Sequence, residues 1–384
     1  MSVRSAGRGP SVSGVAVAGA VLVAGAALLS SCAVGPGVAD PTPEPRPHRT
    51  RVEPGGPPTG AGARQVPGGP QDPTALPARR VDQALLAASL YDLDGTTSLV
   101  VVDAADGAWV RSDVPVSPAV PLQLAPDGRS FLQSSWETDE GHSVVEVVEL
   151  GTGTVRPVPL GLSQDCLVDA VAWAPDSVHL AVVSVCSAPQ VYPVEPTVWT
   201  LVEEVEVATG AARLVERVLD AVPVETYPSY SPDGRLLAYG IVHPAPRADE
   251  DDEWVSVRVV GTHGDGDPHE WPMTHVVYGD PWRDDTTLLA WDKAASVTGP
   301  DSHVLLSATD GSAVPYGIEG LANLDGFVGG RLLAEQWDAV GTAPACAAAL
   351  CAVDLDTHAV EPWLTLPAGL RVQFVSPARA LLDR

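Results

Sequence analysis

Lysine is almost absent from this sequence. Its 384 residues include one lysine, Lys293, and lysine and arginine together number 22 against 49 aspartates and glutamates. The net charge of −27 is uneven, because residues 1–80 contain eight arginines and four acidic residues, which leaves −31 on the remainder. A domain this acidic repels phosphate backbones, so we expect no nucleic-acid partner.

Helical periodicity is also lacking. After Arg80 no long stripe of apolar residues recurs at the 3.6-residue period of a helix. Short apolar runs alternate instead with turn-forming residues, which is typical of an all-β domain.

The sequence contains neither a Gly-x-Ser-x-Gly nucleophile motif nor a His-Glu-x-x-His zinc motif. One stretch is rich in possible metal ligands, but the spacing of its three histidines fits no standard zinc site, which leaves a solvated turn as the alternative. These residues are His263, Asp265, Asp267, His269, Glu270 and His275. The segment at 92–95 resembles the start of a calcium loop without its downstream glutamate. We expect no metal and no cofactor.

The N-terminus has the features of an export signal. Two arginines precede an apolar run at 15–29, which is shorter than the roughly 20 residues of a membrane span. The run ends in Leu-Ser-Ser followed by Cys32, which resembles the bacterial lipobox. The resemblance implies a cleaved signal peptide at 1–31, a diacylglyceryl group on Cys32, and a protein anchored to the cell membrane on its extracytoplasmic face. An uncleaved anchor with a chance cysteine is the alternative.

Residues 33–80 contain twelve prolines and eight glycines without apolar periodicity. Such composition favours polyproline geometry over helix or sheet. We therefore predict a disordered tether at 32–80 and a folded domain at 81–384.

Two turn motifs alternate along this domain. The first is a small residue, proline, aspartate and glycine between two apolar runs, where proline presets the turn and aspartate accepts a local N–H. Its copies lie at 125–128, 174–177 and 231–234, with weaker ones at 284–285, 325–326 and 376–378.

The second motif is an aliphatic pair followed by a turn that closes on glycine. The closing positions are 107, 153, 210, 264, 311 and 358, at spacings of 46, 57, 54, 47 and 47 residues. The sixth position is His358 instead of glycine, so we expect His358 to have a positive φ. Six units of four strands predict a six-bladed β-propeller, because a β-sandwich, the alternative, does not repeat two turn motifs six times.

The first motif is most complete at Tyr230-Ser231-Pro232-Asp233-Gly234 and the strand that follows it. It is similar to the repeats of TolB-type and WD-type propellers, and the resemblance covers residues 85–384. It implies the fold and says little about function, since propellers host many activities.

The ends of the domain are expected to close the ring. Residues 84–113 supply a blade without its first strand, and 370–377 supply a strand without a blade. Pairing them leaves no exposed sheet edge.

The cysteines fit an oxidised domain better than a reduced cytosolic one. Cys166 and Cys186 lie eight residues before and nine residues after the turn at 174–177, so they should pair across the first hairpin of a blade. Cys346 and Cys351 can pair only if residues 347–350 turn, because an extended segment would hold them ~16 Å apart.

Two classes of function remain. The first is a non-catalytic, monomeric propeller that binds a protein with a basic surface, or another envelope component, through its long second-to-third-strand loops. The candidate binding residues in these loops are Trp136, Glu137, Asp139, Tyr192, Asp249, Glu250, Asp251, Asp252, Glu253 and Trp337. Their acids could instead serve only solubility. The second class is an enzyme, such as a lyase or hydrolase, with its site in the central channel.

The lipid anchor is directly testable. Mass spectrometry of the mature protein should find a diacylglyceryl group on Cys32, and Cys32→Ala should release the protein from the membrane fraction. Cys166→Ala is the matched control and should leave the protein membrane-bound. A mature N-terminus upstream of Cys32 would contradict the prediction.

Overall fold

We describe a computed structural model of the chain. It describes residues 65–382 except 93, 117–121, 138–141, 164, 189–196, 224–227, 244–253, 265, 278, 293–302, 319–320, 322, 337–345 and 347. The chain divides into two units, Met1–Val52, which lies outside the described residues, and Glu53–Arg384. Within the described residues no helix is long and apolar enough to cross a membrane.

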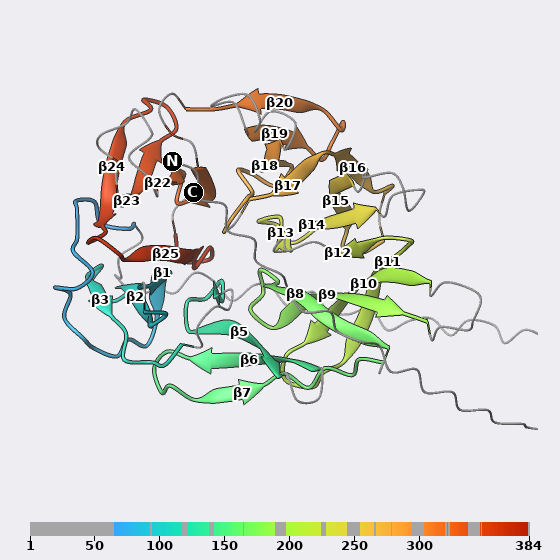
Figure 1. Cartoon of the computed structure of the whole chain (residues 1–384), viewed down its shortest axis with the longest axis horizontal. Helices are drawn as coiled ribbons and strands as arrows, with labels where there is room; N and C mark the ends of the chain where they lie inside the picture. Colours follow the sequence, from blue (N-terminus) through green and yellow to red (C-terminus); the bar gives the residue numbers. More distant parts are fainter. Residues whose placement is uncertain are drawn as a thin grey trace, which may run out of the picture. The chain divides into compact units, whose positions relative to one another are not determined.

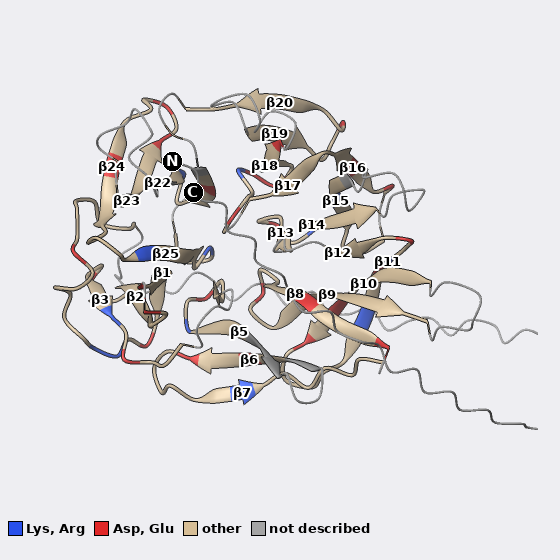
Figure 2. Cartoon of the chain, in the orientation of Figure 1, with Lys and Arg blue, Asp and Glu red and all other residues tan. Residues whose placement is uncertain are grey.

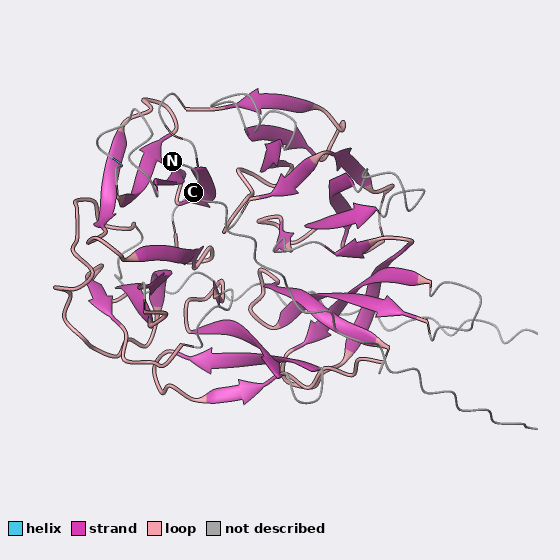
Figure 3. Ribbon diagram, in the orientation of Figure 1, coloured by secondary structure: helices cyan, strands magenta, loops and turns pink. Residues whose placement is uncertain are grey.

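Six antiparallel sheets form the second unit, arranged as the blades of a propeller (Figure 1). Figure 3 shows strands joined by loops in the described part of the chain. The strand ribbons are mostly tan, with charged residues scattered singly along many of them and at the turns (Figure 2). The sequence-based prediction of a six-bladed propeller is confirmed.

Blades 1 to 3 have four strands each, written from the first, inner strand outwards. Blade 1 consists of β25(Arg371–Pro377), β1(Ala84–Tyr91), β2(Thr97–Asp103) and β3(Trp109–Arg111). Blade 2 consists of β4(Gln123–Leu124), β5(Ser130–Glu137), β6(His142–Glu149) and β7(Val155–Pro157). Blade 3 consists of β8(Cys166–Trp173), β9(His179–Ser187), β10(Val198–Glu206) and β11(Ala212–Leu219).

Blades 4 to 6 follow the same order, with the first strand of blade 4 in two pieces. Blade 4 consists of β12(Val222–Pro223), β13(Ser229–Tyr230), β14(Leu236–His243), β15(Trp254–Gly261) and β16(His269–Pro272). Blade 5 consists of β17(Thr274–Val276), β18(Thr287–Asp292), β19(His303–Ser307) and β20(Ala313–Tyr316). Blade 6 consists of β21(Asn323–Val328), β22(Arg331–Gln336), β23(Ala349–Asp354) and β24(Val360–Thr365).

The ring closes as the repeat pattern predicted. β25, the last strand of the chain, pairs antiparallel with β1, from Leu86 opposite Pro377 to Tyr91 opposite Arg371. The backbone N–H of Leu124 also donates to Ser376 Oγ at 2.8 Å, which ties β25 to the first strand of blade 2.

The turn motifs place their special residues as expected. In the first motif Gly128, Ser177 and Gly234 have φ values of 71°, 57° and 74°. In the second, His358 has a φ of 56°, and its N–H donates to Asp354 O at 2.9 Å, as Gly311 does to Ser307 O. His358 therefore adopts the conformation that glycine adopts elsewhere, and this prediction is confirmed.

The prediction that Asp325-Gly326 forms the first-motif turn of blade 6 was wrong. Asp325 and Gly326 lie inside β21, where the register with β22 shifts between Leu324 and Gly326. The turn itself is Gly329-Gly330, both at positive φ. A two-residue Gly-Gly hairpin is itself a recognised turn signal, and it outweighs the Asp-Gly pair here.

Residues 65–83, which we call the N-terminal strap, differ from the expected tether. Gln71 N–H donates to Trp363 O at 2.9 Å in β24, and Arg79 N–H donates to Arg111 O at 3.0 Å in β3. Leu76 is 8% exposed in the core shared by blades 6 and 1. Proline-rich composition does not reveal this, because proline is tolerated in an extended segment that pairs at a sheet edge.

The strap also holds a third blade. Arg79 forms ion pairs with Asp103 and Asp106 in blade 1, and Arg80 Nη1 donates to Thr152 O at 2.7 Å in blade 2. The strap thus crosses the outer side of the ring at the blades where the chain ends meet.

Loss of the strap's buried leucine should destabilise the domain. Leu76→Ala should lower the free energy of unfolding by about 2–3 kcal/mol, because it removes apolar contacts from a packed core. Leu214→Ala is the control, since Leu214 is 57% exposed, and should change it by less than about 0.5 kcal/mol. Urea unfolding of the lipid-free protein measures both. Equal effects of the two variants would mean that the strap does not pack on the blades in solution.

Candidate functional site

The strand order gives the propeller two different faces. The turns between first and second strands, and between third and fourth strands, lie on one face, which we call the short-turn face. The second-to-third-strand loops and the blade crossovers lie on the other, which we call the long-loop face. Antiparallel alternation of four strands dictates this separation.

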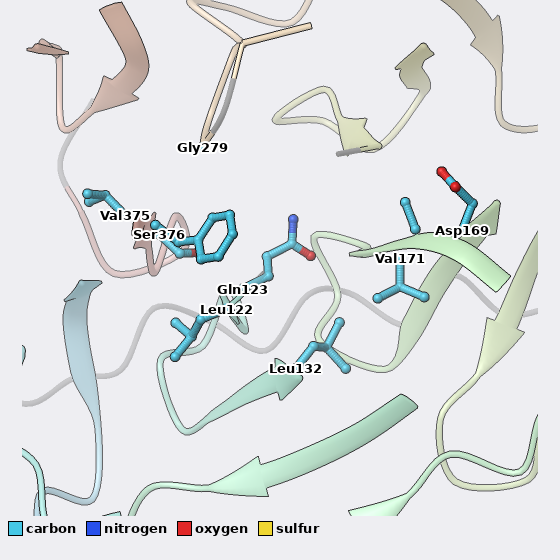
Figure 4. A pocket seen from close by; sticks show the side chains of 10 residues that line it. Leu122, Gln123, Leu132, Asp169, Val171, Gly279, Val375 and Ser376 are labelled. Atoms are coloured by element: carbon cyan, nitrogen blue, oxygen red, sulfur yellow. The ribbon is translucent and has the colours of Figure 1, made fainter. Parts of the chain in front are cut away.

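The central cavity is small. The first strands of blades 1, 2 and 3, together with Leu122, Leu132 and Gly279, line a space of about 40 Å³, which is room for two or three water molecules. Gln123 and Asp169 are its polar side chains on β4 and β8, and most of the remaining wall is apolar (Figure 4). Gln123 Oε1 accepts from the N–H of Trp173 at 2.7 Å and so joins blades 2 and 3.

Gly279 is required by close backbone packing around this cavity. It has a φ of 89°, and a Cβ there would lie 2.5 Å from Asp325 O and 3.3 Å from Val375 O. A side chain at this position would push apart the first strands of blades 6 and 1.

Asp325 lies at the register shift of β21, and its Oδ2 is buried without a hydrogen-bond partner among the described residues. Burial raises the pKa of the Asp325 carboxyl to about 7. Asp169 occupies a similar register shift in β8. The first strands therefore carry carboxylates among mostly apolar and small residues. The signal was present as single aspartates within apolar strands.

The short-turn end of the channel is covered by the C-terminal segment 378–382, which we call the C-terminal cap. Arg379 donates to Tyr230 O at 2.5 Å and to Ser229 Oγ at 2.9 Å, and it forms an ion pair with Asp280. The N–H of Ala380 donates to Pro126 O at 3.0 Å. The cap thus reaches from blade 1 to blades 2, 4 and 5. Sequence analysis missed Arg379, because nothing local marks its partners.

Both predicted disulfides are present, and both lie at the long-loop end of their blades. Cys166 and Cys186 are paired opposite each other in β8 and β9, with Cα atoms 4.0 Å apart. Cys346 and Cys351 are joined with Cα atoms 5.8 Å apart, and Ala348 between them has a φ of 53°, as the required turn demands. One pair closes the strands that precede loop 189–196, and the other follows loop 337–345.

Most of the candidate binding residues lie outside the described residues. Trp136 and Glu137 lie at the long-loop end of β5, with backbones opposite Ser143 and His142. The others, with Cys32, lie outside the described residues: Asp139, Tyr192, Asp249, Glu250, Asp251, Asp252, Glu253 and Trp337. The strands that flank their loops end on the long-loop face, as expected.

One residue of the ligand-rich stretch, Glu270 in blade 4, belongs to a half-buried ion-pair network. Arg258 donates to Glu216 of blade 3 at 2.5 Å and to Glu270 at 2.8 Å, while Glu270 also contacts His243 Nε2 at 2.7 Å. Tyr239 O–H donates to Glu216 as well. Burial alone would lower the pKa of Arg258, but the hydrogen bonds and charge of Glu216 outweigh it and raise that pKa. Within the described part of the chain, no group of three ligating side chains could hold a metal ion.

Comparisons with known proteins give structural likenesses alone. No protein-family model matches the sequence, and no curated protein matches it. A crystal structure of TolB from Acinetobacter baumannii is 13% identical with a TM-score of 0.43 and covers 76% of this chain; this chain covers 66% of TolB, just under two thirds.

Two other solved structures are similar in the same range. The β-propeller domain of the Trilobed protease from Pyrococcus furiosus is 11% identical, with a TM-score of 0.42 and coverage of 76% of this chain and 86% of that one. The oligogalacturonate lyase from Vibrio parahaemolyticus is 12% identical, with a TM-score of 0.43 and coverage of 70% and 72%.

The buried carboxyl predicts a pH dependence of stability. The folded protein binds a proton at Asp325 more tightly than the unfolded chain does. The contribution of Asp325 to the free energy of unfolding is therefore fully present below about pH 4 and is lost as the pH rises towards about 7. Asp325→Asn should remove this loss and raise the melting temperature more at pH 8 than at pH 5. Asp356→Asn, at an exposed turn, is the control. Equal shifts at both pH values would show that Asp325 is not buried as a neutral acid.

Proposed function

We propose that this protein is a non-catalytic, lipid-anchored extracytoplasmic propeller that binds a protein with a basic surface through its long-loop face. The observation that carries the proposal is the asymmetry of the two faces. The C-terminal cap covers the channel at the short-turn face, whereas both disulfides support the bases of loops at the long-loop face.

The disulfides favour this use of the long-loop face. A covalent link at the base of a loop limits its conformations, and a restricted loop loses less entropy when it binds. Disulfides persist in oxidising compartments, which agrees with the export signal and with the lipid attachment expected at Cys32.

The charge of the loops suggests the kind of partner. These loops contain eleven acidic residues and two basic ones, Arg247 and Lys293. The eleven are Glu137, Asp139, Glu140, Glu195, Asp249, Glu250, Asp251, Asp252, Glu253, Asp301 and Asp338. Such a field attracts basic protein surfaces, and the attraction weakens as salt rises. Trp136, Tyr192 and Trp337 would supply apolar anchors.

A channel enzyme is the second candidate, favoured by Asp169 and by the raised pKa of Asp325 on first strands. Among the described residues, the cavity between the first strands of blades 1, 2 and 3 weighs against it, since about 40 Å³ holds water and not a sugar ring or a peptide.

Paired charge variants test the binding face. Asp251→Asn with Asp252→Asn, and separately Trp136→Ala with Trp337→Ala, should each reduce recovery of a cross-linked partner at least fivefold, because they remove the attraction and the anchors. Asp82→Asn with Asp356→Asn removes the same charge from the short-turn face and should leave recovery unchanged. Raising salt from 50 to 300 mM should reduce wild-type recovery more than that of the loop charge variant.

Equal recovery from all three double variants would mean that the acids serve solubility and that the long-loop face is not the site.

A further inference from the structure

A separate pocket lies on the short-turn face between blades 4, 5 and 6 and the C-terminal cap. Its volume is about 100 Å³, more than twice that of the central cavity. Its apolar wall comes from five elements that are distant in sequence: Pro232, Trp282, Phe327, Val328, Leu355, Pro377 and Leu382. Trp282, Phe327 and Val328 are nearly fully buried, so they form its floor.

The pocket exists because blade 6 departs from the repeat. Blades 2, 3 and 4 have a Pro-Asp turn between their first two strands, but blade 6 has the two-residue turn Gly329-Gly330. With φ values of 53° and 73°, this is a turn of type I′, which leaves the two central N–H groups outside the strand ladder. Neither N–H has a backbone partner among the described residues, and both glycines are exposed. Two turn residues without side chains leave the space open.

Positive charge is available at the rim of this pocket. Arg283 lines it, is exposed, and forms no ion pair within the described part of the chain. Asp280 is the one acid in the lining, and it is neutralised by Arg379. Asp284, the next residue after Arg283, does not line the pocket, and its carboxylate accepts from the N–H groups of Thr286 and Thr287.

These features match one kind of ligand. A guanidinium binds a carboxylate through two parallel hydrogen bonds, and consecutive N–H groups in left-handed turns form an anion-binding concavity. At roughly 10–15 Å³ for each water-sized group, the scale used for the central cavity, the pocket holds about seven to ten non-hydrogen atoms. That is the size of a valine or leucine unit together with its carboxylate.

We propose that this pocket binds a carboxylate carried next to a small branched apolar group, as in a free aliphatic amino-acid derivative or at the C-terminal leucine or valine of a polypeptide. Capture of a terminal carboxylate by backbone N–H groups is a recurring mode of peptide recognition. The pocket is on the face opposite the long loops, so the proposal does not rest on the proposed function.

Isothermal titration of the full mature protein with N-acetyl-L-leucine tests the site. N-acetyl-L-leucine should bind at least tenfold more tightly than N-acetyl-L-leucinamide, which keeps the apolar group and lacks the carboxylate. Arg283→Gln should weaken binding of the acid at least tenfold. Arg235→Gln is the matched control, because Arg235 lies on the same face outside the pocket and its side chain is 79% exposed. It should leave binding unchanged.

A second variant tests the apolar half of the site independently of charge. Leu355→Phe adds volume to the pocket wall and should weaken binding of N-acetyl-L-leucine at least tenfold. The melting temperature of this variant should stay within two degrees of the wild type. The pentapeptide Gly-Gly-Gly-Ala-Leu then separates the two sources. Tighter binding of its free-acid form than of N-acetyl-L-leucine assigns the pocket to polypeptide C-termini, and equal binding assigns it to small acids.

Three results would overturn the proposal. The first is equal affinity for N-acetyl-L-leucine and N-acetyl-L-leucinamide. The second is an affinity for the acid that Arg283→Gln leaves unchanged. The third is no detectable binding of the acid at 20 mM. None of them bears on the long-loop face, whose own test uses different residues.

Discussion

The antiparallel pairing of β25 with β1 joins the two ends of the domain and is the constraint on which the rest of the propeller depends. Without it, blade 1 has no inner strand, and the central cavity loses the wall formed by Phe374, Val375 and Ser376. The inner edge of β1 would then be open to pairing with other chains. The C-terminal cap also depends on this pairing, because it begins directly after Pro377.

Both chain ends reinforce the closure after making it. The N-terminal strap bonds to the outer strands of blades 6 and 1, and the C-terminal cap bonds to blades 2, 4 and 5 on the short-turn face. A ring closed by hydrogen bonds alone opens at its weakest pair of strands. Here β25 pairs with the inner side of blade 1, the strap joins the outer strands of blades 6 and 1, and the cap joins the end of β25 to blades 2, 4 and 5. Opening of the ring beside blade 1 therefore requires the loss of more than one set of contacts.

This closure makes the two faces unequal. The short-turn face consists of local turns whose geometry is set by proline, aspartate and residues at positive φ, and its centre is covered. The long-loop face carries the segments that the repeat does not constrain, supported at two bases by disulfides. The short-turn face departs from the repeat at blade 6, where the Gly-Gly turn lines a pocket. Rigid blades with variable connections are a general arrangement for binding.

Local and repeated signals in the sequence were enough to predict several features of the fold. These are the six blades, the pairing of the terminal strands, the positive φ of His358, and the position of Cys166 opposite Cys186. Each follows from turn chemistry and from a strand period of two, which act over a few residues. The same reasoning failed for Asp325-Gly326 because two turn signals lay close together and the Gly-Gly pair formed the hairpin.

Tertiary structure alone decided which distant segments meet. The packing of Leu76 against blade 6, the contacts of Arg379 with Asp280 and Ser229, and the burial of Asp325 each join residues that no local pattern relates. The pocket beside Arg283 likewise needs five elements at once. Burial and charge pairing depend on neighbours in space. The sequence therefore does not reveal the raised pKa of Asp325 or the exposed Arg283 at the rim of the pocket.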